Sequence, residues 1–147
     1  MQDDASQRQL AADLFNRVWT LLDMDPRAPA QNVEMIHTAH ASRYHWGHVG
    51  TPVNVARGEW QVSRVYATLG RGEPALVHAR LCLETCTAND IGGFDLAYAH
   101  EALARAYRVL GDEERAAAHA ADAAAAGEAI AEADDRELFE GDLADLR

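Results

Sequence analysis

The sequence contains no lysine, so all 13 of its basic residues are arginines, and they stand against 24 acidic residues. The formal net charge is -11. A chain so acidic repels a phosphate backbone instead of releasing its counterions. We therefore expect no nucleic-acid partner.

Long hydrophobic runs are also missing, as is a basic segment followed by an apolar one at the start of the sequence. These absences argue against a membrane span and a secretory signal, so we expect a cytoplasmic protein with no membrane partner. Only two cysteines are present, Cys82 and Cys86. Their spacing suits neither a disulfide nor a complete zinc site, and we expect reduced core thiols.

Aromatic residues make up only 7% of the chain, and β-branched residues are sparse outside short stretches. Alanine supplies much of the 48% hydrophobic content. This composition favours closely packed helices over sheets. A length of 147 residues suits one domain with one core, so we expect a single helical domain over 1–147.

An internal repeat is present in the second half of the sequence. The segment 64–70, RVYATLG, is echoed by 105–111, RAYRVLG, at an offset of 41 residues. The same offset relates Ala75, His78 and Ala79 to Ala116, His119 and Ala120. Each glycine is placed to end a helix in the left-handed conformation, and small residues beyond it allow a second helix to pack closely. The pattern predicts two helical hairpins.

The order of tyrosine, glycine and small residues in these hairpins resembles the tetratricopeptide repeat, and the second copy is the better match. The resemblance covers about residues 53–130, and the period of 41 exceeds the family's usual 34 or so. We expect the excess in a loop over 87–93 and in the longer helix that follows. The resemblance implies antiparallel hairpins stacked as a short solenoid, and a role in binding peptides or partner proteins.

The flanking segments are predicted to be helical as well. Apolar residues recur at helical spacing near 5–23, and a second helix is expected over 31–47, so that residues 1–50 form a degenerate hairpin. The segment 132–147 is predicted to cap the stack with a final helix. The fold class is therefore all-α, with about seven helices.

The same resemblance implies that the first helix of each hairpin lines a concave groove. Arginines are concentrated there, and their forked side chains pair with carboxylates and stack on aromatic rings. Such a groove would suit an acidic peptide, a chain terminus or an anionic small molecule, although the arginines could equally form a solvated lattice of ion pairs. The expected groove residues are Arg57, Trp60, Arg64, Tyr98, Glu101, Arg105 and Arg108.

Four of the seven histidines fall between residues 37 and 48, and His37, His40 and His48 share one face of a helix. Three histidines on one face could bind a transition metal, although no motif such as H-E-x-x-H accompanies them. Hydrogen bonding within a half-buried face would explain them equally well. His78 and His119 recur at equivalent repeat positions, which favours a packing or surface role over catalysis.

No nucleophile motif or phosphate-binding glycine loop is present. The sequence therefore predicts a non-catalytic binding protein that needs no cofactor. The alternative is a metal-binding protein or metalloenzyme that uses His37, His40 and His48. The alanine-rich stretch 116–126 could pack against another helix, so we expect either a homodimer or packing of that face on the capping helix.

Overall fold

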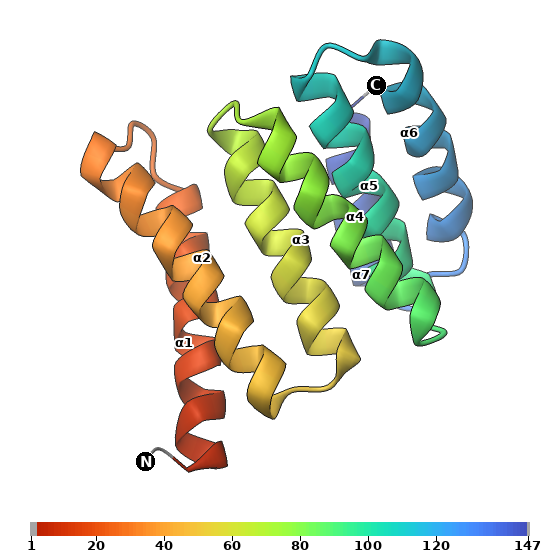
Figure 1. Cartoon of the computed structure of the whole chain (residues 1–147). Helices are drawn as coiled ribbons and strands as arrows, with labels where there is room; N and C mark the ends of the chain where they lie inside the picture. Colours follow the sequence, from red (N-terminus) through yellow and green to blue (C-terminus); the bar gives the residue numbers. More distant parts are fainter. Residues whose placement is uncertain (1–2, 147) are drawn as a thin grey trace.

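The structure is a computed structural model that describes residues 3–146. These residues form seven α-helices. They are α1 (Asp4–Leu22), α2 (Pro29–Val49), α3 (Pro52–Thr68), α4 (Gly72–Ala88), α5 (Gly93–Val109), α6 (Glu113–Gly127) and α7 (Ala133–Ala144), as labelled in Figure 1. The predicted all-α class and the number of helices are confirmed for these residues.

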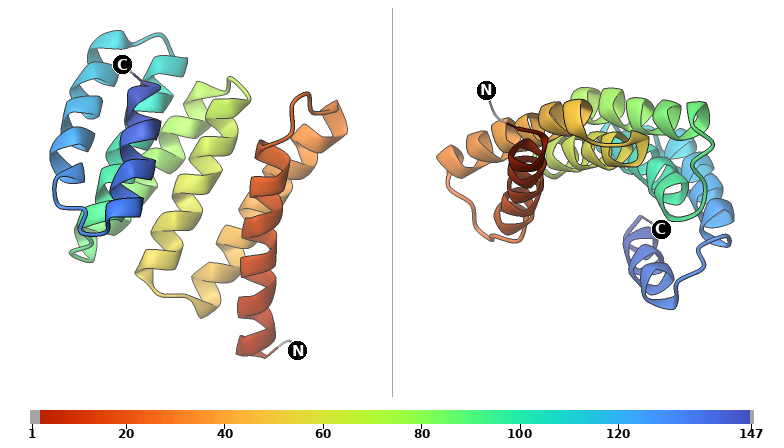
Figure 2. Two further views of the ribbon diagram at one scale, coloured as in Figure 1. Left: turned by 180° about the vertical axis from the view of Figure 1, so that it is seen from behind. Right: turned by 90° about the horizontal axis from the view of Figure 1, so that it is seen from below.

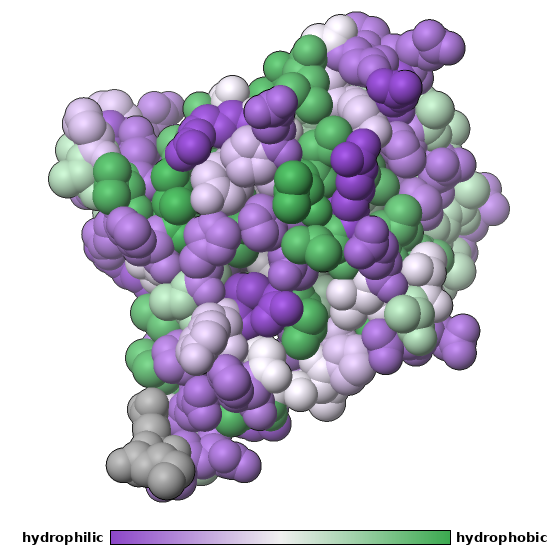
Figure 3. Space-filling view, viewed as in Figure 1, coloured by the Kyte–Doolittle hydropathy of each residue, from purple (hydrophilic) through white to green (hydrophobic). Residues whose placement is uncertain are grey.

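Successive helices run antiparallel, and most contacts join helices that are neighbours in the chain (Figure 1). The helices follow a curve, and α1 and α7 face each other across its hollow side (Figure 2). No helix within the described residues is long and apolar enough to cross a membrane. The opposite side of the molecule carries mostly polar residues with small apolar groups among them (Figure 3).

The two hairpins α3–α4 and α5–α6 turn in the same way. Gly70 and Gly111 have φ values of 75° and 80°, a left-handed conformation that glycine adopts without strain. After the first glycine the amide of Arg71 donates to the carbonyl of Tyr66 over 2.8 Å, and after the second Asp112 donates to Tyr107 over 2.9 Å. The repeated sequence therefore folds into one turn geometry used twice.

Small residues permit close packing within the first hairpin. Ala75 and Ala79 of α4 are fully buried, and the buried hydroxyl of Ser63 donates to the carbonyl of Ala75 over 2.8 Å. Cys82 and Cys86 are free and buried, as predicted.

The first two helices form a further antiparallel pair. Val18 and Leu21 of α1 pack with Met35 and Ala39 of α2 and with α3. The hydroxyl of Ser42 donates to the carbonyl of Ala11 over 2.8 Å and ties the helices together. Their bounds differ by only one or two residues from the predicted ones.

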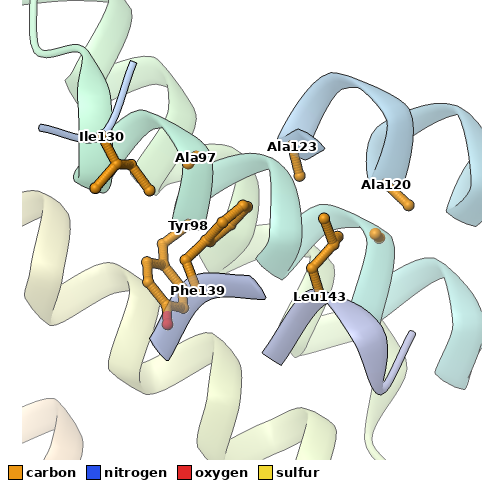
Figure 4. Packing of buried hydrophobic residues seen from close by; sticks show 8 residues of the cluster. Ala97, Tyr98, Ala120, Ala123, Ile130, Phe139 and Leu143 are labelled. Atoms are coloured by element: carbon orange, nitrogen blue, oxygen red, sulfur yellow. The ribbon is translucent and has the colours of Figure 1, made fainter. Parts of the chain in front are cut away.

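The last helix packs on α5 and α6. Its two buried residues, Phe139 and Leu143, contact Tyr98 of α5, Ala123 of α6 and Ile130 of the connecting loop (Figure 4). The alanine face of α6 thus packs within the chain, in part against the predicted capping helix.

One detail of the prediction is wrong. The expected loop over 87–93 is shorter, because α4 continues to Ala88 and α5 begins at Gly93. Helices α3, α4 and α5 each have 17 residues, so the helix after the loop is as long as the two before it. The period of 41 residues is therefore made up of these helices and short connections.

Candidate functional site

A groove of about 560 Å³ is lined by residues of α1 and α7 and of the helices between them. Helices α1 and α7 lie on the hollow side of the molecule (Figure 2). Helices α3 and α5 form most of its floor, and Cys82 of α4 lies at its base. The lining residues are Phe15, Trp19, Ala56, Arg57, Trp60, Arg64, Cys82, Phe94, Asp95, Tyr98, Asp135, Leu138 and Asp142. Its size and its mainly apolar lining with a few charged groups are typical of small-ligand and peptide sites.

Aromatic rings form a continuous row across the groove. Trp19 of α1 lies 5.6 Å from Trp60 of α3, measured between ring centroids, and Trp60 lies 5.4 Å from Tyr98 of α5. Phe94 follows at 4.8 Å from Tyr98. These side chains belong to three different helices, so the row exists only in the folded chain.

Arg57 lies on the edge of the groove with half of its side chain exposed. Its Nε and Nη2 donate to the two carboxylate oxygens of Asp95 over 2.8 and 3.3 Å. This hydrogen-bonded pair raises the pKa of Arg57. Arg57 is therefore already paired, although part of its guanidinium still faces solvent.

Glu101 lies beneath the groove floor and is fully buried. It accepts hydrogen bonds from Nε1 of Trp60 at 3.3 Å, Nη1 of Arg64 at 3.3 Å and Nε of Arg105 at 2.7 Å. Two arginines thus share one buried carboxylate. The excess positive charge is balanced by a carboxylate from another helix.

That second carboxylate belongs to Asp142 of α7. Its Oδ2 accepts a hydrogen bond of 2.6 Å from the hydroxyl of Tyr98, and its Oδ1 lies 3.5 Å from Nη2 of Arg64. Burial, then the bond to Asp142, raises the pKa of Tyr98 far above its ordinary value, so its hydroxyl remains a donor. Arg64 and Tyr98 together form a place for one carboxylate.

The predicted groove residues are only partly brought together. Arg57, Trp60, Arg64 and Tyr98 line the groove, and Glu101 supports it from below. Arg105 bonds to Glu101, and Arg108 donates to the carbonyl of Asp145 over 2.8 Å; neither lines the groove. Residues of α1 and α7 also line the groove and were not among the predicted ones.

The three histidines of the predicted metal site point to different surroundings. His37 and His48 are exposed. His48 packs on the ring of Tyr44 at 4.8 Å, whereas Nε2 of His40 lies 2.8 Å from the hydroxyl of Tyr66. Within residues 3–146 these histidines do not form a cluster of metal-ligating atoms.

A buried ion-pair network in the first repeat was also missed. Glu59 accepts a 2.7 Å hydrogen bond from Nε of Arg43, and its other oxygen lies 2.7 Å from Nδ1 of His78. Burial acts to raise the pKa of Glu59, but the bonds and charges of these two partners outweigh it and the pKa falls below its ordinary value. The network joins α2, α3 and α4.

The equivalent place in the second repeat holds different residues. His100 corresponds to Glu59 and His119 to His78 at the repeat offset, and Asp122 of α6 lies beside them. One ligand atom from each of these three residues lies within 4.8 Å of the others. Burial, the largest influence, lowers the pKa of His100.

Comparison with known proteins finds no family model, no curated protein and no solved structure that matches this chain.

Proposed function

We propose that this chain is a non-catalytic binding protein of the cytoplasm, built as a short solenoid that resembles tetratricopeptide repeats. Its ligand occupies the groove between α1 and α7 and carries an apolar or aromatic group together with a carboxylate or similar anion. The observation that carries this proposal is the row of aromatic rings beside a place for a single carboxylate.

The aromatic row supplies the apolar part of the site. Trp19, Trp60 and Phe94 are each partly exposed in the groove, where they leave apolar surface for a ligand to cover. Burial of apolar surface stabilises a complex by about 25 cal/mol per Å² before the costs of association. A flat ring or a hydrophobic side chain fits this lining.

The anion-binding part of the site, formed by Arg64 and Tyr98, is occupied by a carboxylate of the same chain. Asp142 lies on Arg64 and Tyr98, and its contact with Arg64 is the longer one at 3.5 Å. A ligand carboxylate that replaces Asp142 would keep the charge balance of the Arg64, Arg105 and Glu101 group. A chain terminus, an acidic side chain and a small organic acid share this chemistry.

Charge alone would not attract such a ligand. Asp95, Asp135 and Asp142 outnumber the two lining arginines, and the chain carries a net charge of -11. Binding must therefore depend on the aromatic rings and on exchange of one carboxylate for another. A highly acidic peptide without an apolar residue should bind poorly.

Three probe types would separate the sources of the anion. They are fluorescently labelled hexapeptides with one aromatic residue and a free C-terminus, the same peptides with amidated ends and an internal glutamate, and 8-anilinonaphthalene-1-sulfonate as a small aromatic anion. We expect at least one type to bind, and Trp60→Ala to weaken it about tenfold, since losing an aromatic anchor costs upwards of about 1 kcal/mol.

Matched substitutions test the groove itself. Arg64→Gln should weaken binding because it removes the guanidinium that the ligand anion would contact, whereas Arg115→Gln, which removes an exposed arginine of α6, should leave it unchanged. Asp142→Asn should strengthen binding because it removes the competing carboxylate. If no probe binds, or if Trp60→Ala binds like the unsubstituted chain, the proposal is wrong.

A further inference from the structure

The second repeat contains a group of histidines that the groove does not use. His100 lies two positions after Tyr98, about 200° around α5, and therefore faces away from the groove toward α6. There it meets His119, whose ring lies 6.2 Å away and nearly parallel. The Nδ1 atoms of both histidines are buried and have no hydrogen-bond partner.

In the first repeat, the histidine at the equivalent position has a hydrogen-bond partner. Tyr66 stacks on His78 at 5.9 Å, and Tyr107 stacks on His119 at 5.4 Å, so the two histidines have the same neighbour. In the first repeat Glu59 then accepts the bond of His78. In the second repeat His100 stands where that carboxylate would be, and the polar atoms remain unpaired.

A third group completes the arrangement. Asp122 is one turn after His119 on α6, and its Oδ2 lies 3.9 Å from Nδ1 of His119. Each neutral imidazole has one ring nitrogen without a hydrogen, and this nitrogen, like a carboxylate oxygen, can only offer a lone pair. A water molecule has two hydrogens to donate, whereas a divalent cation can accept a lone pair from all three residues.

We propose that His100, His119 and Asp122 form a metal site between α5 and α6 for a divalent transition metal such as zinc. Two imidazoles and one carboxylate are a borderline set of nitrogen and oxygen ligands that suits this class of ion. Three protein ligands leave a fourth position for water or another ligand.

The site requires only a small local adjustment. Ligand atoms about 2.0 to 2.1 Å from a tetrahedral zinc lie about 3.4 Å apart, compared with the 4.8 Å limit within which these three atoms are found. The side chain of Asp122 is 59% exposed and free to rotate toward the histidines. Metal binding would tie α5 to α6 without involving the groove.

The test uses the full chain without a histidine tag. Metal-free protein is titrated with Zn²⁺ by calorimetry, and with Co²⁺ by visible absorption, which reports a site of low coordination number. We expect one equivalent to bind. His119→Ala should weaken binding at least about tenfold. Even substitution of a residue that only hydrogen-bonds to a metal ligand lowers metal affinity by about 10- to 100-fold.

Three further variants keep the proposal falsifiable. Asp122→Asn changes an exposed side chain, so it should leave the fold intact and also weaken binding, whereas His37→Ala and His48→Ala should not weaken it. The proposal is overturned if the chain binds no stoichiometric metal. It also fails if His119→Ala and Asp122→Asn bind as tightly as the parent, or if the His37 and His48 variants alone lose the metal.

Discussion

Two buried carboxylates, Glu59 and Glu101, join the helices of this protein through their partners. Glu101 and Trp60 occupy equivalent positions of the two repeats, yet they bond to each other across the repeat boundary. Arg64 and Arg105 are also equivalent, and both bond to Glu101. A buried charge is costly unless it is paired and hydrogen-bonded, so these bonds specify how the repeats sit together.

At the residue scale, Glu59→Gln should lower the free energy of unfolding at neutral pH by about 2 kcal/mol, because His78 and Arg43 lose a charged acceptor. A carboxyl whose pKa is lower in the folded chain contributes stability above its unfolded pKa of about 4.3. That contribution disappears as the pH falls through the folded pKa.

Urea unfolding at a series of pH values checks this prediction. The difference between the parent chain and Glu59→Gln should be largest near neutral pH and should shrink below the ordinary carboxyl range. A difference that stays constant down to the most acidic pH at which both proteins fold would contradict it.

At the element scale, α7 is the helix on which the groove depends most. It has only two buried residues, but it contributes Asp142, which occupies the anion-binding position, and Leu138, which lines one wall of the groove. Phe139 anchors it beside Gly127 at the end of α6, where a Cβ atom would lie 2.5 Å from Cε2 of the Phe139 ring. The absence of a side chain at Gly127 therefore makes room for the anchor.

Two glycine-to-alanine substitutions should change stability in opposite directions. Gly127→Ala should lower the free energy of unfolding by about 1 to 3 kcal/mol, because Phe139 must move and α7 then packs less well on α6. Gly141→Ala, inside α7, meets nothing within 4 Å and should add about 0.5 to 1 kcal/mol of helix stability. Free energies of unfolding in urea measure both, and equal signs would refute this account of α7.

At the scale of the whole molecule, the packing is mainly between chain neighbours. Proteins built in this way open from their ends, because each element contacts mainly the next. The two central helices α3 and α5 contain many buried residues, among them Val62, Val65, Ala99 and Ala102. The outer helix α1 contains three buried residues, and the outer helix α7 contains two.

Hydrogen exchange followed by mass spectrometry should therefore show the slowest exchange in α3 and α5 and the fastest in α7. Gly127→Ala should accelerate exchange in α7 while α3 keeps its protection. Equal protection in all seven helices would instead indicate one cooperative unit and contradict the expectation.

Local patterns in the sequence allowed much of this fold to be predicted. Helical spacing of apolar residues located the seven helices, and the repeated glycines at 70 and 111 located two equivalent turns. These features depend on residues within a few positions of one another. The homodimer predicted from the alanine stretch stays a prediction. The structure shows only that Ala116, Ala120 and Ala123 are buried within the chain.

The groove was predicted only in part, because a helical pattern does not say which distant helix a side chain meets. Arg57, Trp60 and Arg64 were expected on the concave side, but Trp19 and Asp142 were not. The histidines were judged by their spacing along one helix, which favoured His37, His40 and His48. The group formed by His100, His119 and Asp122 comes together only because α5 and α6 pack side by side.

The sequence by itself determined where helices begin and end, since capping, apolar spacing and glycine turns are local. The tertiary structure decided which polar and charged groups meet: Arg64 with Asp142, Arg57 with Asp95, and His100 with His119. The physical reason is that electrostatic pairing and metal ligation act over a few ångströms in space. Only the stacking of helices brings such distant positions so close.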